Sequence, residues 1–160
     1  MNNISLPDDV LVHVNDLQVH FFLFEGIVQA VNGVSFQVKQ GKTLGVIGES
    51  GSGKSVSAQS IMGIVPSPPA KQIGGEIHMR IGAENGSHEI VNLADIPRTG
   101  EKFRAIRGKE IGMIFQEPMT SFSPLHTIGN QIMEAILLHI PGATKASARE
   151  RAVDLLRRVG

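Results

Sequence analysis

The sequence has no cysteine, no tryptophan and no tyrosine. Without cysteine the chain can form neither disulfides nor thiolate metal sites, which fits a reducing compartment. Without tryptophan and tyrosine, an aromatic ring that stacks on a ligand has to belong to a phenylalanine or a histidine. The six histidines are scattered without the spacing of metal ligands, so surface or packing roles are the better interpretation.

The chain also lacks net charge and long apolar runs. It has 15 basic and 15 acidic side chains, so no global field favours nucleic acid or an anionic membrane as a partner. The amino terminus has neither the basic nor the apolar region of a signal peptide. No apolar run approaches the length of a bilayer span. We therefore expect a soluble cytosolic protein, with one core or two small subdomains, that can dock on a membrane partner.

The most informative stretch is residues 48–55, which match every fixed position of the phosphate-binding pattern G-x-x-x-x-G-K-[ST]. The apolar run at residues 43–47 predicts a buried strand before the loop, and residues 56–62 have helical composition. One alternative is a glycine- and serine-rich surface turn, which the flanking strand and helix disfavour. A dinucleotide-binding G-x-G-x-x-G is excluded because Val56 occupies the third glycine position.

The residue types of this loop suit the phosphates of a nucleotide. Glycines permit positive φ and bring successive backbone N–H groups together, and a helix that starts near Gly53 adds unpaired N–H groups. We expect Lys54 to contact the β- and γ-phosphates and the Ser55 hydroxyl to ligate Mg²⁺. The predicted nucleotide contacts in this region are Gly48, Glu49, Ser50, Gly51, Ser52, Gly53, Lys54, Ser55 and Val56.

The residues before the loop predict an antiparallel layer. Residues 10–22 alternate as a strand with a break at Asn15-Asp16, and a turn follows at Glu25-Gly26. A second strand is expected from Val28, a hairpin turn at Asn32-Gly33, and a third strand over residues 34–38. This layer leads into the buried strand at 43–47, so we expect a mixture of α+β and α/β architecture.

The residues after the loop predict shorter elements. The first helix is expected to end near Gly63, residues 76–81 and 89–93 to form strands around a hairpin signal at Asn85-Gly86, and residues 111–115 to form a short apolar strand. The charged segment 98–109 is interpreted as a solvated helix face rather than a polyanion site, because Glu101 interrupts its basic residues. Further helices are expected from Thr127 and from about Thr144.

In combination these motifs resemble the ATP-binding subunit of an ABC transporter, specifically the oligopeptide/dipeptide importer family. Three stretches carry the resemblance, in the family's order and spacing: the opening strands at 17–21 and 28–36, the Walker A loop at 48–55, and the Q-loop at 114–125. It covers nearly the whole chain. The fold it implies is α/β, a phosphate-loop ABC ATPase core with an antiparallel β-subdomain.

The resemblance also implies boundaries within the chain. The antiparallel β-subdomain would comprise about 10–42 and 74–95, the phosphate loop and its helix 43–63, the Q-loop region 110–127, and the start of the helical subdomain 127–160. The family's LSGGQ-type signature, Walker B acid, catalytic glutamate and switch histidine are not found in the 160 residues. We therefore expect the amino-terminal part of a longer ATPase, one that alone binds ATP weakly and hydrolyses little of it.

Further site residues follow from the same resemblance. Gln116 would contact Mg²⁺ or the attacking water, because an amide oxygen binds a cation without adding charge. Phe21 would stack on adenine and Val28 would line the same side, with Phe22 and Phe24 as rivals for the stacking role. Core packing alone is the other interpretation of this phenylalanine cluster. Many ABC ATPases have a hydroxyl residue at position 56, so here only the backbone N–H of Val56 is expected to contact a phosphate.

The family's architecture implies partners. These are a second ATP-binding subunit, identical or not, two membrane permease subunits and, indirectly, an extracytoplasmic solute-binding protein, but no nucleic acid. The expected cofactors are ATP and Mg²⁺, and the expected place is the cytoplasmic face of the inner membrane. The transported solute is left open. Two other functions are weighed: a phosphate-loop ATPase that acts on DNA or another macromolecule, and an interaction fragment that does not hydrolyse ATP.

Overall fold

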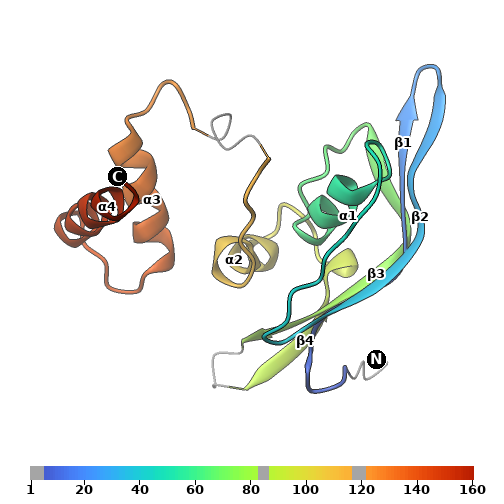
Figure 1. Cartoon of the computed structure of the whole chain (residues 1–160), viewed down its shortest axis with the longest axis horizontal. Coiled ribbons are helices and arrows are strands. Elements are labelled where there is room, and N and C mark those ends of the chain that lie inside the picture. The colour runs from blue at the N-terminus through green and yellow to red at the C-terminus, as the bar shows by residue number, and fades with distance from the viewer. Residues whose placement is uncertain (1–5, 83–86, 117–121) are drawn as a thin grey trace. The chain divides into compact units, whose positions relative to one another are not determined.

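The computed structural model describes residues 6–82, 87–116 and 122–160. The chain forms two compact units, residues 1–111 and residues 112–160, and each is described here by itself (Figure 1). The hairpin signal at Asn85-Gly86 and residues 117–121 of the predicted Q-loop lie outside the described residues.

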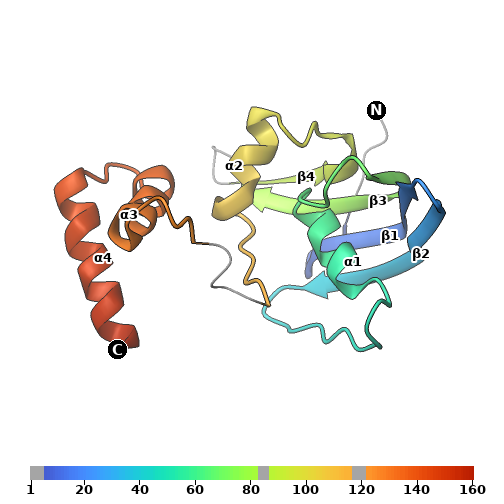
Figure 2. The same ribbon diagram turned by 90° about the horizontal axis from the view of Figure 1, so that it is seen from above.

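The first unit contains a four-stranded antiparallel sheet in the order β2-β1-β3-β4 (Figure 2). Its strands are β1 (Val10–Leu23), β2 (Gly26–Lys39), β3 (Ala70–Gly82) and β4 (His88–Asn92). The chain reverses between β1 and β2 at residues 24–25, as the sequence predicts. The predicted antiparallel layer is therefore confirmed, including the return strand that pairs β4 with β3.

The hairpin predicted at Asn32-Gly33 is wrong, because β2 runs through both residues without turning. The register with β1 jumps from Leu17↔Val34 to Gln18↔Asn32, so Gly33 is an extra residue in a β-bulge with φ +79°. The predicted break in alternation at Asn15-Asp16 is confirmed, because β1 continues as one strand but its register with β2 and β3 shifts there and Asp16 has φ +48°. At Asn32-Gly33 the turn signal becomes a bulge because β1 continues past these residues and stays paired with β2 before and after them.

Two helices pack on one face of this sheet (Figures 1 and 2). They are α1 (Lys54–Ile61) and α2 (Glu101–Lys109), and a short 3₁₀ turn, η1 (Leu93–Asp95), follows β4. The core joins Val19 of β1 and Ile77 of β3 to Phe103 of α2, each at most 1% exposed. The alternating apolar residues of the strands therefore face the helices, which fixes α1 against the sheet.

The strands predicted at residues 43–47 and 111–115 are not formed, and this corrects both predictions. Ile47 is 98% exposed and Ile114 is 92% exposed, although both belong to apolar runs. A strand needs a neighbour that offers backbone partners. Within the described ranges, the one β-bridge formed by either run is the isolated bridge between Arg107 and Ile111.

The second unit contains two helices, α3 (Ile128–His139) and α4 (Lys145–Val159). The predicted N-cap at Thr127 is confirmed, because its side chain accepts a hydrogen bond from the Asn130 N–H. The helix expected from about Thr144 also forms, and Thr144 caps it in a capping box with Ser147. Ile136 packs with two alanines of α4 to form a small core. None of the helices in the described ranges combines the length and apolar character that crossing a bilayer requires.

Candidate functional site

The phosphate-binding pattern forms a loop that leads into the first turn of α1. Gly51 and Gly53 have φ of +80° and +85°, the left-handed conformation that glycine adopts without strain. Gly53 is the N-cap of α1 and offers no side chain to cap it. The first bond that closes within the helix runs from the Ser57 N–H to the Gly53 carbonyl (2.8 Å). The N–H groups of residues 54–56 are thus left free by the helix for a ligand.

The start of α1 is held against the sheet by a backbone contact. A Cβ at Gly53 would lie 2.3 Å from the carbonyl oxygen of Ala30, so only glycine allows this approach. Ala30 is itself the extra residue of a β-bulge, since the register jumps from Val19↔Val31 to His20↔Gln29. Ala30 was not predicted as a site residue, and no side-chain signal identifies it because the contact uses its carbonyl group.

The side chain of Lys54 folds back over the loop. Its Nζ donates to the carbonyl oxygens of Gly48 (2.7 Å) and Glu49 (2.5 Å) and to the Ser52 hydroxyl (3.1 Å). A Cβ at Gly48 would lie 2.6 Å from the Ser52 Oγ, so this glycine also leaves room for the ring of oxygens. Among the contacts of the described residues, no carboxylate pairs with Lys54, and its positive charge is available to an anion.

The rest of the loop fits a phosphate group as well. The first turn of α1 carries no acidic residue, so nothing there repels an anion. Ser55 is exposed beside the free N–H groups, as are Glu49 and Ser50 of the loop. Val56 packs against the core of the first unit. Its side chain anchors the helix, which leaves only its backbone N–H to face the loop.

The predicted adenine platform spans β1 and β2, and β2 is the strand that contacts the loop through Ala30. Phe21 and Val28 are direct cross-strand partners, and Val28 is two residues from Ala30 on β2. Phe21 shares a face with the buried Val19 and packs partly against the core. Its rivals are more exposed, at 46% for Phe22 and 104% for Phe24. The choice among the three phenylalanines stays a prediction.

Gln116 belongs to the second unit, where its side chain is exposed. Ser55, its predicted partner at the metal, belongs to the first unit. The two units are described separately, so a shared Mg²⁺ site of Gln116 and Ser55 stays a prediction.

Comparison with known proteins finds one family across most of the chain. The family model described as ABC transporter matches residues 31–160. The chain is 43% identical over 150 residues to the oligopeptide transport ATP-binding protein OppD of Bacillus subtilis. It is 44% identical over 151 residues to the dipeptide transport ATP-binding protein DppD of Escherichia coli. Both alignments cover 94% of this chain, but only 38% and 42% of the relatives.

The fold has relatives among solved structures. A dimeric post-hydrolysis state of the ATP-binding cassette MJ0796, bound to ADP and Pi, superposes with a TM-score of 0.71 at 24% identity. The match covers 92% of this chain and 56% of that cassette. The chain thus has the fold of part of an ATP-binding cassette, and it spans about two fifths of the length of the two curated relatives.

Proposed function

The chain belongs to the ABC transporter family, and on that premise we propose that it is the ATP-binding part of an ATPase that drives the import of peptides or similar small solutes. The observation that carries the proposal is the ammonium of Lys54, held by three loop oxygens at the open start of α1. The names of the two curated relatives, which are oligopeptide and dipeptide transport proteins, support the solute class.

Different residues of the site make different contacts with ATP. The N–H groups of residues 54–56 donate to phosphate oxygens, and the positive end of the α1 dipole stabilises their charge. Lys54 exchanges its bonds to loop carbonyls for bonds to the β- and γ-phosphates. Ser55 and Gln116 supply oxygen ligands for Mg²⁺, which neutralises phosphate charge when bound. Phe21 and Val28 form the surface against which adenine lies.

The proposed assembly follows from the family. Two ATP-binding subunits, identical or different, face each other and attach to two permease subunits at the cytoplasmic face of the membrane. A solute-binding protein delivers the solute from outside. The dimer of the MJ0796 cassette supports a paired arrangement for proteins of this fold. We further propose that the 160-residue chain alone hydrolyses ATP slowly, because neither a water-activating glutamate nor a Walker B acid is found in its sequence.

Calorimetry of ATP binding in the presence of Mg²⁺ tests the proposal on the chain as it stands. Lys54→Ala removes the one side-chain cation of the loop, and we expect it to weaken binding by roughly tenfold or more, since a charge-assisted hydrogen bond is worth about 1.5–3 kcal/mol. Lys42→Ala, which removes an exposed lysine outside the loop, is the matched control and should bind as the parent chain does. Equal affinity of the parent chain and Lys54→Ala would contradict the proposed role of the loop.

A further inference from the structure

A polar pocket lies at the opposite end of α1 from the phosphate loop. Its volume is about 430 Å³, and its walls come from the end of α1, the first residues of β3, η1 and α2. Ser60 and Gly63 line it from the helix side. With a rise of 1.5 Å per residue, Ser60 lies about 9 Å along the helix from Lys54. The pocket is therefore separate from the phosphate loop, although both share the same helix.

Two basic residues line this pocket, Lys71 from β3 and Arg98 from the segment before α2, and no acidic residue does. Arg98 donates from Nη1 to the Val65 carbonyl (3.3 Å), which fixes its guanidinium but leaves its charge uncompensated. In the part of the chain that the structure describes, neither Lys71 nor Arg98 forms an ion pair. A chain with equal numbers of acids and bases thus leaves two cations on one hollow surface.

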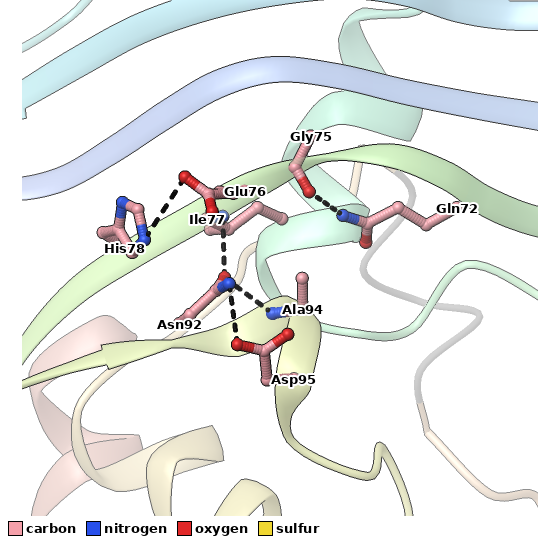
Figure 3. Close-up of polar contacts among 8 residues, drawn as sticks. All are labelled: Gln72, Gly75, Glu76, Ile77, His78, Asn92, Ala94 and Asp95. Atoms are coloured by element: carbon pink, nitrogen blue, oxygen red, sulfur yellow. Dashed lines mark hydrogen bonds and ion pairs between the residues drawn. The ribbon is translucent and has the colours of Figure 1, made fainter. Parts of the chain in front are cut away.

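Two acids that are next to pocket-lining residues in sequence, Glu76 and Asp95, have other polar partners (Figure 3). Asp95 accepts a hydrogen bond from Nδ2 of Asn92 (3.0 Å), and Asn92 also binds the N–H groups of Ile77 and Ala94 through its Oδ1. Glu76 is turned toward His78, with its Oε2 3.7 Å from Nε2. The contacts of Asn92 fix η1 against β3. Because Glu76 and Asp95 have these other partners, the positive charges of Lys71 and Arg98 are not neutralised by them.

The walls of the pocket are rigid and offer further donors. Phe103 packs so closely on Gly63 that a Cβ there would lie 2.6 Å from its ring, and Arg107 stacks on Phe103 at 4.9 Å while donating to the Arg98 carbonyl. Two carbonyl groups near the end of α1 already accept hydrogen bonds, that of Ser60 from the Gly63 N–H and that of Gln59 from the Ile64 N–H. Ser67, which carries a hydroxyl group, also lines the pocket.

We propose that this pocket binds the phosphate group of a small phosphate monoester, with Lys71 and Arg98 as its cationic contacts. Arginine and lysine together suit a dianionic phosphate, because the guanidinium donates in a planar fork and the ammonium acts as a point charge. Leu93 and Ile96 line the same pocket and offer apolar surface to the organic part of the ester. The proposal does not depend on the ATP-binding function.

Amide NMR of the chain titrated with inorganic phosphate or with glycerol 3-phosphate tests the proposal. All titrations use a Lys54→Ala background, which suppresses binding at the phosphate loop. We expect saturable shifts of amides in the pocket wall, such as Gly74 and Ala94, and tighter binding of glycerol 3-phosphate than of inorganic phosphate. Absence of shifts up to tens of millimolar, or tighter binding of inorganic phosphate, would overturn the proposal.

A pair of lysine variants tests the charge directly. Lys71→Gln should weaken glycerol 3-phosphate binding roughly tenfold or more, as expected for the loss of one charge-assisted contact. Lys102→Gln removes a neighbouring cation that pairs with Glu89 and does not line the pocket, and it should leave the affinity unchanged. Equal weakening by both substitutions would mean that only net charge matters, and it would overturn the assignment of Lys71.

Discussion

The two units of the chain are stabilised in different ways. Among the described residues, thirteen buried hydrophobic side chains form the core of the first unit, and they come from segments as distant as Val14 and Ile106. The core of the second unit has three buried residues, from two helices that follow each other in sequence. The first unit therefore depends on long-range pairing and the second on local helix signals. The same kind of substitution should have unequal effects in the two units.

The largest expected effect comes from a glycine at which the neighbouring strands β1 and β3 approach each other closely. Gly75 of β3 has φ +83°, and a Cβ there would lie 2.3 Å from the carbonyl oxygen of Asp16 on β1. Gly75→Ala therefore combines strain at positive φ with a clash against the backbone of β1, which cannot move away because it is paired in the sheet. We expect a loss of about 3 kcal/mol in the free energy of unfolding, measured by urea denaturation.

A glycine of the second unit provides the matched control for that substitution. Gly142 has φ +75° but open space around the added Cβ, so Gly142→Ala carries the strain without the clash. We expect about 1 kcal/mol for this variant. A cost for Gly75→Ala no greater than that for Gly142→Ala would show that the first unit does not depend on the close approach of β3 to β1.

A smaller effect is expected at the capping box of α4. Thr144 accepts a hydrogen bond from the Ser147 N–H, and the Ser147 hydroxyl accepts one from the Thr144 N–H. Thr144→Ala should destabilise the second unit by about 1 kcal/mol and speed amide exchange in α4, with no change in the strands of the first unit. Thr99→Ala, which removes an exposed threonine outside any helix cap, is the control. Unchanged exchange in α4 would contradict the view that local signals stabilise this unit.

The sequence allowed prediction of the elements whose signals are local. The helix after the phosphate loop, the cap at Thr127, the helix from about Thr144 and the antiparallel layer all formed where their residues indicated. The apolar runs at 43–47 and 111–115 were predicted wrongly, because apolar composition indicates burial but does not supply a strand partner. Asn32-Gly33 was misread for a related reason, since a turn dipeptide also suits a bulge when the neighbouring strand continues.

In the candidate site too, features with a local sequence signal were predictable, and features that depend on the fold were not. The glycine conformations of the phosphate loop could be predicted because the pattern requires particular residue types at fixed spacing, and the positive φ values of Gly51 and Gly53 agree with that requirement. The nucleotide contacts of the loop stay a prediction. The contact of the Ala30 carbonyl with Gly53 could not be predicted, because it depends on a bulge and on backbone atoms. The pocket at Lys71 and Arg98 was also missed, since its walls come from four segments that only the fold brings together.

The smallest expected effect concerns the ion pair that closes the far end of the β1–β2 hairpin. Lys39 Nζ lies 2.7 Å from Asp9 Oδ2, and its hydrogen bond lowers the pKa of the Asp9 carboxyl. A carboxyl whose pKa is lower in the folded chain contributes stability above its unfolded pKa, and that contribution is lost as pH falls through the folded value. Asp9→Asn should therefore reduce the loss of stability that occurs as the pH falls. The reduction should be slight, because both side chains are more than half exposed.

Urea denaturation across the acidic range, at low and high salt, measures this effect. Lys39→Gln is the partner variant: it should abolish the same part of the decline, and adding Asp9→Asn to it should change nothing further if the pair acts as a unit. High salt should shrink the difference, because exposed charges are screened. An effect at Asp9 as large as that of Gly75→Ala would reverse the comparison, since a local surface contact would then matter to the sheet as much as the approach of its strands.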